Sequence, residues 1–135
     1  MGHVIQVKDS DRALGSILEL AGKHGIAGAL AAKAGATLLD LTAPIPRVDR
    51  LEIFTFDDEE GRETYWHTAS HVMAQAVKRL HPDARLAIGP AIDEGFYYDF
   101  DCPVPFSPEE NERIEKEMAA IIAADLPVKR LQITR

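Results

Sequence analysis

Residues 64–80 carry the pattern of an amphipathic helix that is long enough to need other elements packed against it. At about 100° per residue, its apolar side chains fall on one stripe, made of Ala69, Val72, Met73, Ala76, Val77 and Leu80. Pro82 follows closely and is expected to end the helix. Such a helix is stable only when its stripe is buried, so the rest of the chain must supply a second layer.

Two histidines, His67 and His71, lie one helical turn apart on the side of this helix opposite the apolar stripe. Neighbours at i and i+4 place their imidazole rings side by side. The pair suits a shared metal ion, a shared water molecule or a substrate held between two hydrogen-bonding rings. Two histidines on a polar helix face are also often only solvated, and the spacing alone favours that interpretation.

Zinc chemistry finds little support in the sequence. The thermolysin-type motif has a glutamate directly after its first histidine, and here Thr68 stands at that position. A zinc site needs three or four ligands, whereas Cys102 and the remaining histidines form no second close pair. We therefore expect neither a metalloprotease nor a metal bound by this chain alone; His67 and His71 would hold one only if other ligands completed the site.

Composition bounds the class of protein. The chain has 135 residues, of which 46% are hydrophobic and 27% charged, typical of one ordinary globular domain or two small ones. One cysteine excludes an internal disulfide framework, and no apolar run reaches the ~18 residues of a membrane span. The expected location is cytoplasmic. A net charge of −7 argues against a protein that coats nucleic acid, but not against a local RNA contact.

The first part of the chain is expected to form a small mixed α+β domain. The pattern predicts strands at 4–8, 37–41 and 51–56, a helix at 14–23 and a glycine- and alanine-rich helical turn at 26–33. Residues 57–63 are acidic and contain a glycine, which is typical of a connector. The predicted domains are therefore residues 1–60 and 61–135.

The second part is expected to add strands and one more helix after the histidine helix. Short strands are predicted at 85–88 and 128–134, and one half-buried strand with period two at 95–101. Ser107, Pro108 and Glu110 have the spacing of a helix N-terminus. The apolar residues of that helix, predicted to be buried, are Ile114, Met118, Ile121 and Ile122.

Several strings, in order, resemble the N-terminal region of bacterial threonyl-tRNA synthetases. They are Phe56-Asp57-Asp58-Glu59-Glu60-Gly61-Arg62-Glu63, His67-Thr68-Ala69-Ser70-His71-Val72-Met73-Ala74-Gln75-Ala76, Ala87-Ile88-Gly89-Pro90-Ala91-Ile92 and Gly95-Phe96-Tyr97-Tyr98-Asp99-Phe100-Asp101. The resemblance is close over residues 51–135 and looser over 3–50. It implies an α+β chain with a β-grasp-like TGS domain, followed by the beginning of an editing domain.

The resemblance also implies site residues and a function. His67 and His71 match the family's editing histidines, and Gly89 and Tyr98 match positions near its amino-acid pocket. The family's editing domain hydrolyses serine wrongly attached to threonine tRNA. Its Cys-x-x-x-His element is absent here, because Cys102 is followed by Pro103, Val104, Pro105 and Phe106. The chain alone is therefore expected to be inactive, both as a ligase and as a hydrolase.

Cofactors and partners follow from the same resemblance. The family's ATP, magnesium and zinc belong to a catalytic domain outside this chain, so no cofactor is expected here. The implied partners are threonine tRNA and the rest of the synthetase or another subunit, with a homodimer in the full-length family and no membrane. The family's hairpin before the first TGS helix is shortened here, since only residues 8–13 separate strand from helix.

Two other functions stay open. The chain could be a free-standing TGS-type module that binds RNA or protein, with a vestigial editing half-site. It could also be a metal-dependent deacylase assembled across subunits, because alanyl-tRNA synthetase editing domains carry a similar His-Thr-Ala-x-His string.

Overall fold

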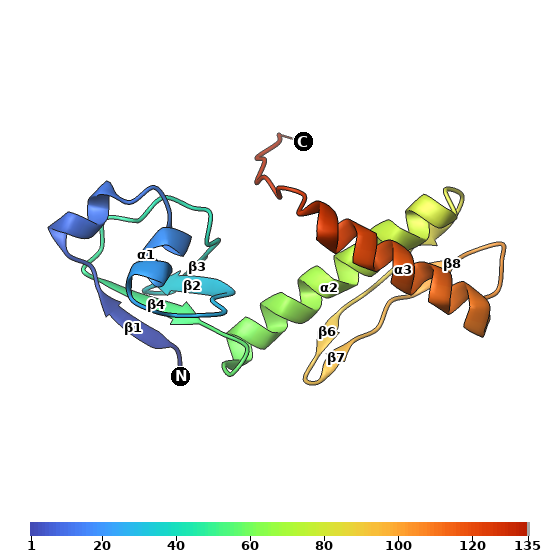
Figure 1. Cartoon of the computed structure of the whole chain (residues 1–135), viewed down its shortest axis with the longest axis horizontal. Coiled ribbons are helices and arrows are strands. Elements are labelled where there is room, and N and C mark those ends of the chain that lie inside the picture. The colour runs from blue at the N-terminus through green and yellow to red at the C-terminus, as the bar shows by residue number, and fades with distance from the viewer. Residues whose placement is uncertain (135) are drawn as a thin grey trace. The chain divides into compact units, whose positions relative to one another are not determined.

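The computed structural model describes residues 1–134 and forms two compact units (Figure 1). The first unit contains residues 1–67 and 91–95, and the second contains residues 68–90 and the chain from residue 96 onward. Arg135, the last residue of the second predicted domain, lies outside the described residues. The domain limit at residues 60 and 61 stays a prediction.

A four-stranded antiparallel sheet forms the first unit, and its strand order is β1-β4-β2-β3. The strands are β1 (His3–Gln6), β2 (Ala31–Ala34), β3 (Thr37–Leu39) and β4 (Arg50–Phe54). In their register Ile5 lies opposite Leu51, and Ala32 lies opposite Ile53. The α+β class expected from the sequence is confirmed.

Helix α1 (Ile17–Lys23) packs on this sheet and closes the core of the first unit (Figure 1). It begins at its N-cap Ser16, whose hydroxyl accepts a hydrogen bond from the Glu19 amide. The buried core residues are Ile5, Ile17, Leu20, Ala21, Ala32, Leu51 and Ile53. A short 3-10 helix, η1 (Asp9–Ala13), links β1 to α1 with no strand between them, as the shortened hairpin predicted.

The helical turn predicted at residues 26–33 is wrong, because its second half is part of strand β2. Alanine favours helices when it is solvated, yet Ala31 and Ala32 are buried in the sheet opposite Phe54 and Ile53. Pairing with both neighbouring strands outweighs that weak local preference. Gly25 and Gly28, each with φ of 70°, shape the turn that precedes the strand.

Helix α2 (Glu59–Leu80) begins five residues before the predicted start, so the acidic connector is partly helical. Its first turn packs closely against the preceding loop. A Cβ on Gly61 would lie 1.8 Å from the Thr55 carbonyl oxygen, so only glycine fits there. The Asp58 carboxylate accepts the Thr55 amide at 2.8 Å, and this bond lowers the pKa of Asp58 below its ordinary value.

The segment 95–101 is divided between two strands, which corrects the prediction of one continuous strand. Strand β7 (Gly95–Phe96) pairs with β6 (Ala91–Ile92), and β8 (Phe100–Asp101) pairs with β5 (Arg85–Leu86). The alternation of side chains nevertheless holds, since Phe96, Tyr98 and Phe100 are half-buried while the residues between them are exposed. The period-two alternation predicted which side chains share a face, but it did not predict which strands pair with each other.

Helix α3 (Pro108–Ala124) starts as predicted, with Ser107 accepting a hydrogen bond from the Glu110 amide at 3.2 Å. Ile114 and Ile121 are buried against α2, and Met118 packs beside them. Ile122 is 65% exposed, so its predicted burial is wrong. One step of about 100° turns it away from the face that Ile121 shares with Ile114.

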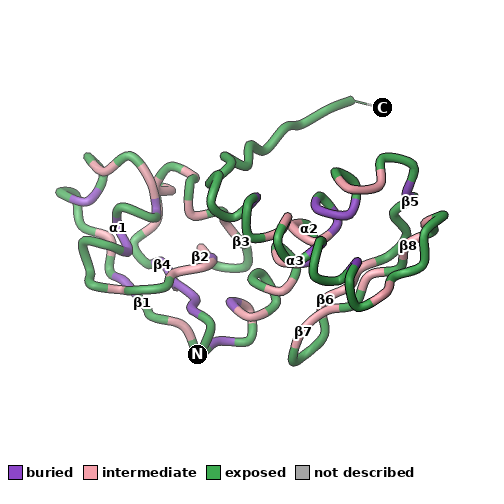
Figure 2. The backbone as a smooth tube through the Cα atoms, turned by 45° about the vertical axis from the view of Figure 1, so that its right-hand side comes forward, coloured by how far each residue is buried: buried purple, intermediate pink, exposed green. Residues whose placement is uncertain are grey.

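Residues 128–134 form no strand, contrary to the prediction, and are exposed throughout (Figure 2). A strand needs a hydrogen-bonded neighbour, and none of the strands within residues 1–134 pairs with this segment. No helix in the described part of the chain is long and apolar enough to span a bilayer.

Candidate functional site

The structure places His67 and His71 on the exposed side of one continuous helix, α2, as the spacing predicted. The opposite side is anchored in the protein by Ala76 and Val77, both fully buried. Ser70 and Ala74 are also buried, with exposed fractions of 0% and 5%. The predicted apolar stripe did not include either residue. Their spacing at i and i+4 is the signal that could have indicated close packing of small side chains.

Gly89 and Tyr98, predicted from the resemblance alone, are in direct contact. A Cβ on Gly89 would lie 2.0 Å from the Tyr98 Cδ2 atom, so the ring occupies space that any other residue would need. The Tyr98 ring also stacks on Phe100, with centroids 4.8 Å apart and planes 19° apart. Backbone bonds from the Ala87 amide to Asp99 and from the Asp99 amide to Ile88 hold the two segments together.

Tyr98 lines an apolar hollow of about 320 Å³ in the second unit. Other walls of this hollow are the aromatic rings of Phe100 and Phe106, Met73 and Val77 of α2, and residues of α3 including Met118. Neither histidine lines the hollow. Of the four predicted site residues, Gly89 and Tyr98 therefore lie together beside the hollow. His67 and His71 lie on the exposed face of helix α2 and not in the hollow.

A polar network fixes α3 to the end of α2 in the same unit. His81 Nε2 lies 2.5 Å from Glu110 Oε1, and Arg113 donates to Glu110 Oε2 at 3.0 Å. The hydrogen bond with His81, supported by the charge of Arg113, holds the pKa of Glu110 below its ordinary value. Glu110 is only 7% exposed, so this network links the residue after α2 to the first turns of α3 at a buried position.

The donor groups present do not fit a resident zinc ion. Within residues 1–134 no group of three or more histidine, cysteine, aspartate or glutamate side chains is placed to share a metal. A catalytic zinc site takes three protein ligands, more than the histidine pair supplies. Cys102 is half-buried, and its side chain packs against the core of the second unit.

The relatives found by comparison with known proteins are threonine–tRNA ligases. Over 107 residues, which are 79% of this chain, it is 54% identical to the threonine–tRNA ligase of Desulforamulus reducens. Over the same length it is 55% identical to that of Clostridium tetani and 52% identical to that of Symbiobacterium thermophilum. No protein-family model matches the chain.

The aligned part of the chain spans only 16–17% of the length of these relatives. The resemblance stated from the sequence strings is confirmed by identities of this size. The chain is thus homologous to one portion of threonine–tRNA ligases.

Proposed function

We propose that this chain, homologous over about four fifths of its length to one portion of threonine–tRNA ligases, contributes to hydrolytic removal of serine from threonine tRNA. An aminoacylation pocket that accepts threonine cannot strongly reject serine, because a missing methyl group changes binding by only about 1–3 kcal/mol. A second, hydrolytic step is the physical remedy for that error. The observation that carries the proposal is the exposed histidine pair within a segment of high identity.

His67 and His71 are proposed to act directly on the ester that joins serine to the tRNA. Ester hydrolysis needs a positioned water molecule and polar groups that stabilise the negative charge developing on the carbonyl oxygen. Two imidazoles at positions i and i+4 of a helix can orient water with one ring and hydrogen-bond the substrate with the other. Both are exposed residues of α2, so a large substrate such as tRNA can reach them.

The histidine pair is proposed to be one wall of the site, completed by other portions of a threonine–tRNA ligase or by another subunit. The hollow beside Tyr98 is lined by neither histidine. Gly89 and Tyr98 are proposed to contribute to the amino-acid pocket. The first unit is proposed to contact tRNA, whereas ATP, magnesium and zinc would serve parts of the ligase outside this chain.

The test uses a chimera in which this chain replaces the matching portion of the Desulforamulus reducens ligase. Purified chimera is mixed with threonine tRNA already charged with radiolabelled serine, and the rate of serine release is measured. We expect hydrolysis by the chimera, and a fall of about 100-fold when both His67→Ala and His71→Ala are present, as for loss of general acid–base groups.

Gln75→Ala is the matched control, because Gln75 is also an exposed residue of α2. It should leave serine release unchanged, and neither set of changes should alter charging with threonine. Equal serine release by the chimera and by its double-histidine variant would contradict the proposal.

A further inference from the structure

One surface of the first unit combines exposed aromatic rings with unpaired acids. Phe56, Tyr65 and Trp66 pack edge to face, with ring centroids 5.1–5.8 Å apart. Phe56 is 44% exposed and Tyr65 is 45% exposed, although a cluster of this kind would normally be buried in a core. Together with the acids described next, these rings form what we call the aromatic–acidic surface.

Two adjoining hollows mark this surface. The larger, about 550 Å³, is lined by Phe56, Arg62, Trp66, Asp93 and Glu94. The smaller, about 470 Å³, includes Glu59, Glu63 and Ile92 in its walls. Arg62 and Asp93 line both hollows, so the two adjoin, and together they are called the depression. Neither hollow is lined by a histidine.

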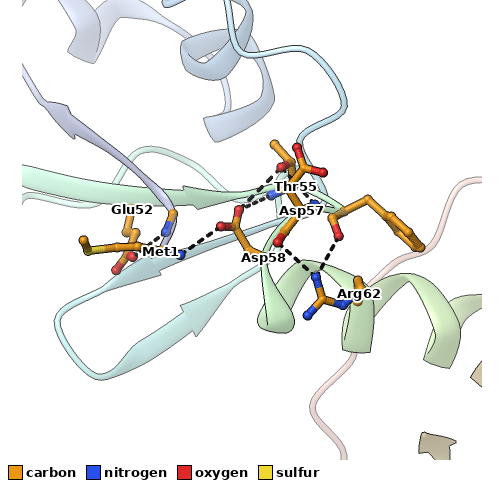
Figure 3. A network of polar contacts seen from close by, with 8 residues as sticks. Met1, Glu52, Thr55, Asp57, Asp58 and Arg62 are labelled. Atoms are coloured by element: carbon orange, nitrogen blue, oxygen red, sulfur yellow. Dashed lines mark hydrogen bonds and ion pairs between the residues drawn. The ribbon is translucent and has the colours of Figure 1, made fainter. Parts of the chain in front are cut away.

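The depression is strongly acidic. Four carboxylates line it, those of Glu59, Glu63, Asp93 and Glu94, and none forms an ion pair with another described residue. Among the described residues that line it, the one cation is Arg62, which donates through Nη1 to the backbone carbonyls of Phe56 at 3.3 Å and Asp57 at 2.9 Å (Figure 3). Its guanidinium is thus held against the loop, and the surplus of negative charge attracts cations.

We propose that the aromatic–acidic surface binds a basic polypeptide segment through arginine side chains. A guanidinium group stacks on aromatic faces and forms paired hydrogen bonds with carboxylates, and this surface offers both. The four carboxylates repel phosphate, so a nucleic-acid backbone does not fit this depression, and the tRNA contact proposed for the first unit would use another of its faces. This inference does not depend on the proposed hydrolysis, because it uses neither His67 nor His71.

The test uses the whole chain and a short probe peptide, acetyl-Gly-Arg-Gly-Arg-Gly-amide. Trp66 is the only tryptophan of the chain and lines the larger hollow, so its fluorescence reports binding at this place. We expect a saturable change in emission with the arginine peptide and none with the same peptide carrying glutamine in place of arginine. Asp93→Asn with Glu94→Gln should weaken binding about three- to tenfold, as for two partly exposed charge pairs.

The pair Asp83→Asn and Glu112→Gln is the matched control, because both residues are exposed and the net charge changes equally. It should bind the peptide as the unchanged chain does. Asp93 and Glu94 lie in the exposed turn between β6 and β7, so their substitution should leave the unfolding midpoint unchanged. Equal weakening by both pairs would overturn the proposal, since net charge alone would then explain binding.

A second variant tests the aromatic part. Phe56→Leu keeps an apolar side chain but removes a ring face, so it should reduce the preference for the arginine peptide over its lysine counterpart. An unchanged preference would contradict the role given to stacking. Competition for the depression by single-stranded oligouridylate would overturn the choice of a polypeptide partner.

Discussion

Gly89 shows how one residue can fix the place of a predicted site residue. The Tyr98 ring lies where a Cβ would be, 2.0 Å from its Cδ2 atom and 2.4 Å from its Cε2 atom. The resemblance named both residues, yet only the structure shows why they belong together. No pattern in a single sequence indicates that a glycine in one strand connection faces a ring nine positions later.

Gly89→Ala should therefore destabilise the second unit by about 1–3 kcal/mol, because the ring must move to admit the methyl group. Urea unfolding followed by circular dichroism measures the change. Gly22→Ala is the control, since nothing lies within 4 Å of its added Cβ in helix α1. That substitution should be stabilising by about 0.5–1 kcal/mol. A neutral Gly89→Ala would show that the contact with Tyr98 is not tight.

Glu110 makes stability depend on acidity. Its hydrogen bond with His81 holds its pKa below the ordinary value of 4.5 in the folded chain. A depressed carboxyl pKa contributes stability above the unfolded-state value, and that contribution is lost as pH falls through the folded-state pKa. The chain should thus be more stable than Glu110→Gln at pH 7, with a difference that shrinks as pH falls below 4.5.

Denaturant unfolding at pH 7 and at several values below pH 4.5 measures this difference. Glu112→Gln, an exposed position on the same helix, should show a small and nearly constant difference. A difference for Glu110→Gln that does not change with pH would refute the assigned role of its charge.

Secondary-structure elements were predictable where local chemistry decides them. Helix α3 began where Ser107, Pro108 and Glu110 indicated, because capping is a local interaction. Strand β2 was not predicted, because its alanines are extended only through hydrogen-bonded pairing with β3 and β4. The division of residues 95–101 depends likewise on partners distant in sequence, which alternation cannot name.

The N-cap of α3 gives a direct test at this scale. Ser107→Ala removes the hydroxyl that accepts a hydrogen bond from the Glu110 amide. The substitution should therefore lower the free energy of unfolding by about 1 kcal/mol. Ser10→Ala is the control, because Ser10 is exposed within η1. Equal effects of the two substitutions, measured by urea unfolding, would argue against the capping role.

For the whole molecule, the fold class and the exposed face of the histidine helix could both be predicted from sequence. The function of that face could not come from periodicity, because a solvated histidine pair and a catalytic one look the same along a helix. The function proposed for that face rests on the flanking strings, whose resemblance to threonine–tRNA ligases is confirmed by identities of 52–55%. The aromatic–acidic surface was not predicted, because it joins residues near 60 with the turn at 93–94.

His67 and His71 are proposed to help remove serine from threonine tRNA. The most direct test of this proposal is the amount of serine-charged tRNA that accumulates when the chimeric ligase is supplied with ATP, serine and threonine tRNA. We predict little accumulation with the unchanged histidines and substantial accumulation with His67→Ala and His71→Ala, at equal rates of threonine charging. Equally low accumulation with both enzymes would contradict the claim.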